Sequence, residues 1–313
     1  MANVFGVDVS KVWFDISDGQ TVFKLDNERS AILKWLKTLP KDAVIAMEAT
    51  SNYHALLAEL AHQYGVIVFV LNPRHVHHYA KGVGRRAKTD KVDASLIRRY
   101  VVQERTYLTT WQPPTPQQKE IDTLTQRRHL LVTKKQSIVM AFKDIADNCE
   151  GYKEMLKQVS TVIDNLEKRI VQTIKQEPNT LRDYQLITSI PGIGPLTAAF
   201  MCNLLNKHSF SSIDQLTSFL GMDLIHADSG KKHSKRTLSK HGSSESRRLL
   251  FNCARAASQG QLKAMYEKFA ARMIHTKATV AMMRKLLKLV FGVWKSKTAF
   301  DINKYQSPLL QIA

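Results

Sequence analysis

The order of short apolar segments over the first hundred residues constrains the fold more than any other feature of this chain. Five segments are predicted to be strands, namely residues 4–9, 12–17, 21–25, 43–48 and 66–71. Helices are predicted between and after them, at residues 28–38, at 52–64, in a short piece after Pro73, and from Asp90 onward. Three strands in a meander followed by alternating helices and strands indicate an α/β fold with a mixed sheet and helices on its faces.

Two carboxylates interrupt these apolar strands. Asp8 lies in the middle of the first strand, between Val7 and Val9, and Glu48 ends the fourth strand. A charge in an apolar strand is costly unless it is paired or binds a metal ion. If the first and fourth strands are neighbours, both carboxylates point to the same region.

A second pair of carboxylates lies in the stretch Lys88-Thr89-Asp90-Lys91-Val92-Asp93. Residues three apart share one face of a helix, so Asp90 and Asp93 aim at one point, as ligands of a divalent cation do. The alternative is an ordinary helix N-terminus, where the helix dipole favours both carboxylates. A strand Asp, a strand-end Glu and a helical Asp pair are together the parts of a two-metal phosphoryl-transfer site. Mg²⁺ is the expected cofactor, with Mn²⁺ as its alternative.

The charge balance indicates a polyanionic partner. The chain has 46 Lys and Arg against 27 Asp and Glu, a formal net charge of +19 that spreads over several segments. Such an excess favours nucleic acid over a merely soluble basic protein. The three cysteines are far apart and fit neither a disulfide framework nor a zinc pattern, which is typical of a reducing cytoplasm. The N-terminus lacks a signal-peptide pattern, and no segment approaches the roughly 20 apolar residues of a membrane span.

Three segments are predicted from composition: a catalytic domain at 1–110, a helical hairpin at 111–180 and a helical domain at 181–313. Clustered prolines at 112–116 mark the first boundary. Residues 117–176 carry sparse apolar residues at helical spacing, and Gly151 divides them into two long helices. A coiled-coil-like hairpin of this kind is a natural dimerisation device, although a structural spacer is the alternative. The last segment is predicted to hold helices at 181–189, 197–205, 213–220, 244–258 and 278–295, with a polar, basic loop at 221–243.

These motifs resemble, in order, those of the DEDD transposases of insertion-sequence family 110, including its 1111 group and the Piv-type DNA invertases. In the first segment the matches are Gly6-Val7-Asp8-Val9-Ser10-Lys11, Met47-Glu48-Ala49-Thr50, Asn72-Pro73 and Lys88-Thr89-Asp90-Lys91-Val92-Asp93-Ala94. In the last segment they are Ile190-Pro191-Gly192-Ile193-Gly194, Gly221-Met222, Asp228-Ser229-Gly230, Leu238-Ser239-Lys240-His241-Gly242 and Arg247-Arg248-Leu249-Leu250. The resemblance implies an RNase H/RuvC-like first domain in which Asp8, Glu48, Asp90 and Asp93 are the metal ligands.

The same resemblance implies a serine nucleophile, and the matching position is Ser229. The residues agree with this role, because cations that can hold a phosphodiester follow closely, namely Lys231, Lys232, Lys235 and Arg236. Ser234 and Ser239 are nearby rivals, since a serine in a basic loop is common. The segment Ile225-His226-Ala227-Asp228 is less basic than in many members of the family, which bears on how the DNA is gripped.

Other residues are predicted to contact nucleic acid. The turn Pro191–Pro195 resembles a helix-hairpin-helix, in which Gly192 and Gly194 let backbone N–H groups approach a phosphate; an ordinary helix–helix turn is the alternative. Further predicted contacts are Arg85, Arg86, Lys88, Lys91 and Lys240. The cluster His75, His77 and His78 has irregular spacing and no nearby cysteine, so a polar surface helix is favoured over a metal site.

The sequence predicts a site-specific DNA recombinase or transposase of a mobile element, which cuts and rejoins DNA through a 5′-phosphoserine intermediate. The expected partners are double-stranded DNA at the element ends and target, a bridge RNA implied by the resemblance, and further copies of the chain. A dimer is expected, with a tetramer in the active complex and an active site completed between protomers. The expected location is the prokaryotic cytoplasm, at the nucleoid. The alternatives are a metal-dependent structure-selective nuclease, a Piv-type DNA invertase and a non-enzymatic nucleic-acid-binding protein.

Overall fold

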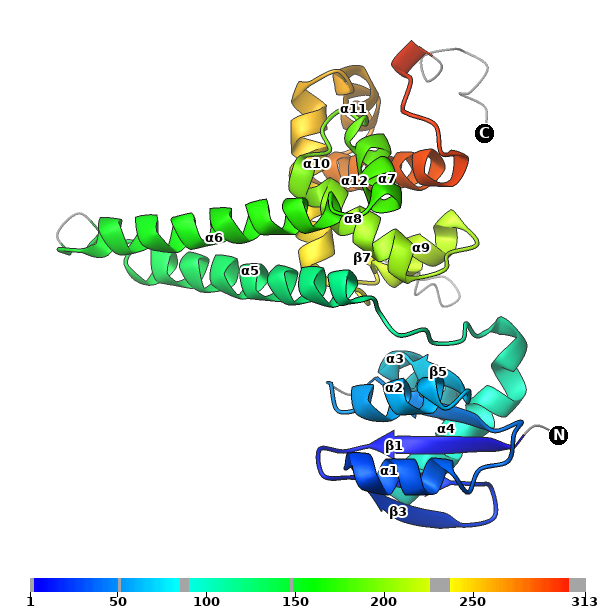
Figure 1. Cartoon of the computed structure of the whole chain (residues 1–313). Coiled ribbons are helices and arrows are strands. Elements are labelled where there is room, and N and C mark those ends of the chain that lie inside the picture. Colours follow the sequence, from blue (N-terminus) through cyan, green and yellow to red (C-terminus); the bar gives the residue numbers. More distant parts are fainter. Residues whose placement is uncertain (1–2, 50–51, 85–89, 147–148, 226–236, 304–313) are drawn as a thin grey trace. The chain divides into compact units, whose positions relative to one another are not determined.

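Figure 1 shows the computed structural model of the chain. It describes residues 3–49, 52–84, 90–146, 149–225 and 237–303, with the side chains of Arg74 and of residues 90–92 left out. The chain divides into two compact units, Met1–Pro113 and Pro114–Ala313. Each unit is described by itself.

The first unit is built on a five-stranded sheet in the order β3-β2-β1-β4-β5. Its strands are β1 (Val4–Val9), β2 (Trp13–Ser17), β3 (Val22–Asp26), β4 (Val44–Glu48) and β5 (Ile67–Leu71). Strand β2 runs antiparallel to both β1 and β3, whereas β1, β4 and β5 are parallel. The predicted mixed α/β sheet is therefore confirmed, with strand limits within one residue of those predicted.

Helices cover both faces of this sheet (Figure 1). They are α1 (Arg29–Leu36), α2 (Ala55–Gln63), α3 (Pro73–Gly82) and α4 (Asp90–Glu104), followed by the 3₁₀ turn η1 (Arg105–Tyr107). Alternate residues of each strand point to opposite faces. Phe14 and Ile16 therefore pack with α1 and α2 on one face, while Val4 packs with Ile97 of α4 on the other.

Helix α4 crosses β1 at Gly6, and the crossing fixes the direction of the helix. A Cβ on Gly6 would lie only 2.2 Å from the Ala94 carbonyl oxygen. Residue 6 therefore cannot carry a side chain while the helix packs this closely. Arg98 Nε, one turn later, donates a hydrogen bond to the Val4 carbonyl at 2.9 Å. Ala94 thus lies near Gly6, and Arg98, further along the helix, reaches back to Val4. The helix therefore runs opposite to β1 and begins near the end of β1 that carries Asp8.

The second unit begins with a hairpin of two long helices, α5 (Pro116–Ala141) and α6 (Tyr152–Ile174), which lie side by side in Figure 1. A capping box between Thr115 and Gln118 starts α5, and Gly151 at φ 78° precedes α6. The predicted pair of helices is confirmed. Its base joins the core of this unit, through residues such as Ile121 and Ile170. Several apolar side chains of the hairpin are exposed, namely Leu130, Met140, Ile145, Met155 and Val162.

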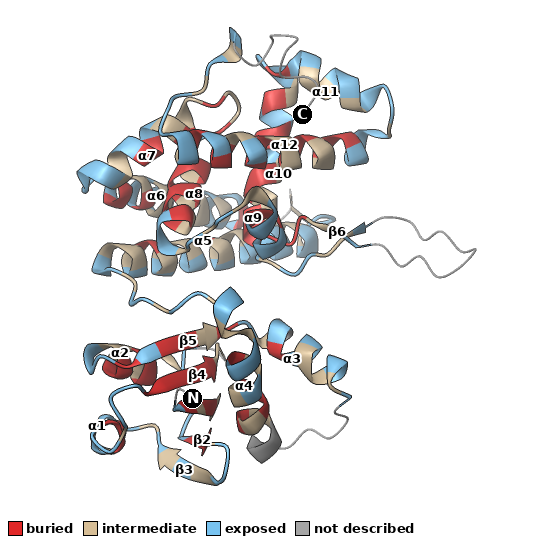
Figure 2. Cartoon of the chain, turned by 90° about the vertical axis from the view of Figure 1, so that its right-hand side faces the viewer, coloured by how far each residue is buried: buried red, intermediate tan, exposed pale blue. Residues whose placement is uncertain are grey.

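The remaining helices form the core of the second unit. They are α7 (Pro178–Thr188), α8 (Pro195–Lys207), α9 (Ile213–Phe219), α10 (Ser244–Gln259), α11 (Lys263–Ala270) and α12 (His275–Ser296). Helices α8 and α10 are largely buried in Figure 2, whereas α5 and α6 are mostly exposed or intermediate. The predicted mostly helical second half is confirmed. No helix in the described ranges is both long and apolar enough to cross a membrane.

Three short elements, one helix and a pair of strands, depart from the prediction. Helix α11 was not predicted, because it has only eight residues and packs through three partly buried side chains, Met265, Tyr266 and Phe269. The segment 221–243 was predicted to be a loop throughout, but β6 (Leu224–Ile225) pairs antiparallel with β7 (Thr237–Leu238) inside it. Each of these strands has only two residues, too few for an alternating pattern to be visible in the sequence.

Candidate active site

Carboxylates from three adjacent strands form a row across the sheet. Asp8 lies directly opposite Asp15 of β2. Val7 lies opposite Met47 in the parallel pair of β1 and β4, so Asp8 and Glu48 follow as neighbours one residue later. All three belong to the face that α4 covers, because Gly6 and Val4 of the same alternating set contact that helix. The structure therefore brings Asp8 and Glu48 to one end of one face, as predicted for neighbouring strands.

The first turn of α4 contributes the second carboxylate pair. Asp90 is its first residue, and its side chain lies outside those described; Asp93 is half-buried. Because α4 starts at the end of β1 that carries Asp8, the helix directs this turn toward the row of strand carboxylates. The roles of Asp8, Glu48, Asp90 and Asp93 as metal ligands stay a prediction.

The donor set of this site matches a hard divalent cation. The predicted ligands all offer carboxylate oxygens, which Mg²⁺ and Mn²⁺ prefer. Within the described residues, no three His, Cys, Asp or Glu side chains gather closely enough to enclose a metal ion. Mg²⁺ is usually held by one or two carboxylates together with waters and substrate phosphates, so an open arrangement of this kind fits it.

Asp15 was not predicted as a site residue. The residue is only 4% exposed and lies opposite Asp8 in the same row. A charged residue inside the apolar run Trp13–Ser17 was the available signal, the same signal that singled out Asp8 in β1.

The predicted nucleophile Ser229 lies outside the described residues, as do Ser234, Lys231, Lys232, Lys235 and Arg236. The structure does describe both ends of their segment. Leu224 pairs with Leu238 and Ile225 with Thr237, so the two residues that flank the segment, Ile225 and Thr237, are neighbours.

The base of this segment is held by close backbone packing. Gly221 has φ 64°, and a Cβ on it would lie 2.4 Å from the His241 nitrogen. Arg247 Nη1 donates hydrogen bonds to the Leu220 carbonyl at 3.2 Å and to the Gly242 carbonyl at 2.7 Å. This backbone packing gives a structural reason for three residues of the motifs quoted above, namely Gly221, Gly242 and Arg247.

Two predicted residues near β7 are described. The hydroxyl of Ser239, a rival nucleophile, donates a hydrogen bond to the Asp223 carboxylate and is thereby fixed at the base of the segment. Lys240 is exposed and adopts a left-handed backbone at φ 54°. Of the cations predicted around α4, Arg85, Arg86 and Lys88 lie outside the described residues, and the Lys91 side chain is not described.

A buried ionic cluster joins the start of α10 to the hairpin. The Glu245 carboxylate, 4% exposed, accepts hydrogen bonds from Arg128 at 2.6 Å and from Arg248 at 2.7 Å, and it contacts His129 Nδ1 at 2.9 Å. Burial raises the pKa of Glu245, but the hydrogen bond and charge of Arg248, with His129 and Arg128, outweigh it and leave the pKa below its usual value. The ionised form of Glu245 is therefore favoured, and its ion pair with Arg128 joins α10 to α5.

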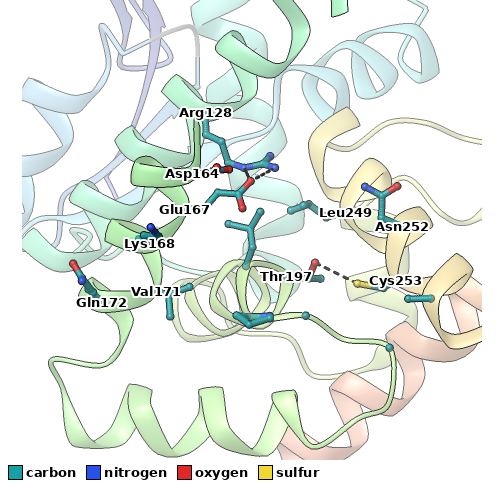
Figure 3. A pocket seen from close by; sticks show the side chains of 15 residues that line it. Arg128, Asp164, Glu167, Lys168, Val171, Gln172, Thr197, Leu249, Asn252 and Cys253 are labelled. Atoms are coloured by element: carbon teal, nitrogen blue, oxygen red, sulfur yellow. Dashed lines mark hydrogen bonds and ion pairs between the residues drawn. The ribbon is translucent and has the colours of Figure 1, made fainter. Parts of the chain in front are cut away.

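The predicted glycine turn borders a pocket of about 740 Å³, shown in Figure 3. It is lined by charged side chains of the hairpin, among them Arg128 and Lys168, and by Thr197 and Cys253. The two predicted glycines differ in their surroundings. Gly192 has φ 89°, and a Cβ on it would lie 2.7 Å from the Cβ of Ala257. Backbone conformation and helix packing therefore both explain a glycine here. Gly194, at the N-cap of α8, faces open space and leaves room for a ligand to approach.

The three histidines of α3, His75, His77 and His78, are exposed, in agreement with a polar surface helix.

Known proteins resemble this chain over both of its units. Residues 5–148 match a family model described as transposase, and residues 184–269 match one described as transposase of the IS116/IS110/IS902 family. The pilin gene-inverting protein of Moraxella bovis is 31% identical over 82% of this chain and 81% of its own length. The transposase for insertion sequence element IS1328 of Yersinia enterocolitica is 25% identical over 96% of this chain and all of its own length. The transposase for element IS1111A of Coxiella burnetii is 22% identical over 81% of this chain and 77% of its own length. The chain belongs to the IS116/IS110/IS902 family of transposases.

Proposed function

We propose that this chain recombines the DNA of a mobile element by transferring a DNA strand to Ser229 and then to a new DNA end, at a site completed by the carboxylates of the first unit. The observation that carries the proposal is the convergence of Asp8, Glu48 and the first turn of α4 at one end of one sheet face. This arrangement is the one expected of an RNase H/RuvC-like domain: a helix crosses a mixed sheet, and acidic residues lie at the strand ends.

The carboxylates prepare the scissile phosphate. Asp8, Glu48, Asp90 and Asp93 would hold Mg²⁺, which when bound supplies charge neutralisation of a phosphodiester. The chain's own part is to set these oxygens on a sheet and a helix that the contacts at Gly6 and Arg98 hold together. A site supported by strands and a packed helix keeps its geometry better than one built on loops.

The strand transfer balances without an outside energy source. The Ser229 hydroxyl oxygen bonds to the phosphorus and the bond from phosphorus to the 3′ oxygen breaks, while the serine proton passes through water to the leaving 3′ oxygen, which becomes a free 3′-hydroxyl. A 3′-hydroxyl from another strand then attacks the phosphoserine, which reforms a phosphodiester and returns the proton to Ser229. Lys231, Lys232, Lys235 and Arg236 would hold the phosphate during both steps.

The partners of this reaction are DNA, an RNA and further copies of the chain. The net charge of +19 suits two nucleic acids, and a bridge RNA pairing with donor and target DNA is part of this proposal. The exposed apolar residues of the hairpin, such as Met140 and Val162, support its role in assembly of dimers and tetramers. Completion of the site between protomers would bring the Ser229 of one copy to the carboxylates of another.

The test is recombination in vitro with the purified chain, Mg²⁺, its RNA and DNA that spans the element ends. Ser229→Ala and Asp8→Asn are each expected to abolish strand exchange, whereas the matched control Ser234→Ala, in the same segment, is expected to retain it. Recombination by Ser229→Ala at the wild-type rate would disprove the serine mechanism.

DNA inversion is a second candidate outcome, favoured by the 31% identity to a pilin gene-inverting protein. A plasmid with two recombination sites in inverted orientation separates the two. Inversion of the intervening DNA identifies an invertase, while joined element ends and insertion elsewhere identify a transposase.

A further inference from the structure

Helix α12 carries a row of cations along its solvent side. Between residues 268 and 300 the chain has eight Lys and Arg and no Asp or Glu. Four of these cations, spaced by seven, four and seven residues, share one side of the helix and are here called the α12 stripe: Lys277, Arg284, Lys288 and Lys295. The three lysines are exposed and Arg284 is half-buried. The opposite side of α12 packs into the core of the second unit, through residues such as Met283 and Leu286. Figure 2 shows both buried and exposed residues along this helix.

The α12 stripe is unfavourable for the helix that carries it. Lys277 lies in the first turn, where the helix dipole favours anions and disfavours a cation. Arg284 and Lys288 are four residues apart, where like charges repel each other. Burial, together with the charge of Lys288, lowers the pKa of the neighbouring Lys285.

These charges are not compensated within the fold. In the ranges that the structure describes, no Asp or Glu forms an ion pair with Lys277, Arg284 or Lys288. Lys295 differs from them, because it donates a hydrogen bond to the Ser211 carbonyl at 3.3 Å and so helps to hold α12 in place. Local electrostatics gives the helix no reason for the first three cations, and an anionic partner would relieve their repulsion.

The composition of the stripe indicates the backbone of a double helix. Proteins that bind single strands stack the bases on aromatic side chains. In α12, however, Phe291 is buried and the Trp294 indole donates a hydrogen bond to Asn206 at 3.2 Å. Double-stranded RNA is recognised through its 2′-hydroxyls as well as its phosphates, and the residues between the cations on this side, Ala281 and Gly292, have no polar side chain. Lys and Arg alone suit the phosphates of double-stranded DNA.

We propose that the α12 stripe binds the phosphate backbone of double-stranded DNA, independently of its sequence. The inference rests on the proposed action of the chain on DNA and adds a binding surface to it. From Lys277 to Lys295 the stripe extends over about 27 Å, at roughly 1.5 Å per residue. B-DNA carries about one charge per 1.7 Å of its axis, so each cation on a helix laid along the backbone has a phosphate within reach.

The test is binding of the purified full chain to a fluorescently labelled DNA duplex of random sequence, followed by anisotropy at increasing KCl concentrations. A triple variant with Lys277→Gln, Arg284→Gln and Lys288→Gln removes three cations and keeps Lys295. Each lost phosphate contact reduces the slope of log affinity against log salt by about 0.9, so a reduction of about 2.7 is expected. The affinity for a second duplex of unrelated sequence is expected to fall by the same factor.

The matched control is a triple variant with Lys34→Gln, Lys37→Gln and Lys41→Gln. It removes the same charge from exposed positions of the first unit, and its slope is expected to change by less than about 0.9, the effect of one contact. Urea unfolding checks the fold of both variants. The stripe variant is expected to unfold at the same urea concentration as the wild type or at a higher one, because its like charges are gone.

Four results would overturn the inference. A slope that changes no more in the stripe variant than in the control would mean that net charge alone acts. Loss of affinity for only one of the two DNA sequences would contradict binding to the backbone. Weaker binding of a double-stranded RNA, with DNA binding unchanged, would assign the surface to RNA. Unfolding of the stripe variant at a lower urea concentration would give the cations a structural role.

Failure of the stripe is distinguishable from failure of the proposed function. If the wild type recombines DNA and the stripe variant binds duplex DNA as the control does, only the stripe is wrong. If the wild type binds no duplex DNA even at low salt, both the stripe and the proposed action on DNA are wrong.

Discussion

Gly6→Ala is expected to push α4 away from the sheet and so to separate the two halves of the carboxylate site. The added Cβ would lie 2.2 Å from the Ala94 carbonyl oxygen, 2.5 Å from the Arg98 nitrogen and 2.7 Å from Arg98 Cβ. Two of these three atoms are backbone, so no rotamer change relieves them, and α4 must move by most of an ångström. Overpacking of this kind costs about 3 kcal/mol, at the upper end of the usual range.

The loss is measured by urea unfolding of the full chain. Three of the four tryptophans, Trp13, Trp35 and Trp111, belong to the first unit, so fluorescence reports mainly on it. Gly82→Ala is the matched control, because nothing lies within 4 Å of its Cβ position. It is expected to be neutral or to stabilise by up to about 1 kcal/mol. If Gly6→Ala unfolds within about 0.5 kcal/mol of the wild type, α4 does not cross β1 as closely as described.

Three further predictions concern the second unit. Gly221→Ala is expected to cost about 2 kcal/mol and to slow recombination without changing the Mg²⁺ response, because it strains the base of the Ser229 segment; Gly260→Ala, whose nearest neighbour is at 3.5 Å, is expected to do neither. Glu245→Gln neutralises one of the two carboxylates that pair with the buried Arg128, and Glu167 remains as the other. It is expected to cost about 2–3 kcal/mol in urea unfolding at pH 7, as loss of a hydrogen bond to a charged group does, whereas a cost under about 1 kcal/mol would mean that the cluster behaves like a surface pair. Burial, with a smaller effect of Lys207, lowers the pKa of His208 from 6.5 to about 4. The unfolded chain therefore binds the proton first, and up to about 3 kcal/mol of stability is lost as the pH falls from 6.5 to 4; urea unfolding of His208→Leu is expected to lack this loss.

The strand carboxylates could be predicted because each one breaks an apolar pattern that is visible in the sequence. Asp8 and Glu48 stand out for this reason, and parallel pairing of β1 and β4 then places them together. Asp15 breaks its strand in the same way, but its place beside Asp8 depends on register, which no single strand reveals. Only the pairing of β1 with β2 shows that it faces Asp8.

The glycines show a second limit of sequence reasoning. Gly192 and Gly194 look equivalent in the turn Pro191–Pro195, yet one is required by contact with Ala257 and the other borders open space. Gly6 gave no signal of its own beyond its place in a motif, although it determines where α4 crosses the sheet. Such close approaches arise between elements far apart in the chain, so local patterns do not report them.

The serine mechanism is tested most directly by trapping its covalent intermediate. The wild-type chain is incubated with Mg²⁺, its RNA and a DNA substrate nicked beside the cleavage position, so that the freed strand diffuses away and resealing is prevented. Protein–DNA adducts are then digested and sequenced by mass spectrometry. The account predicts a nucleotide joined through its 5′-phosphate to Ser229, with no adduct in Ser229→Ala. Cleaved DNA without any adduct, or an adduct on Ser239 in its place, would contradict it.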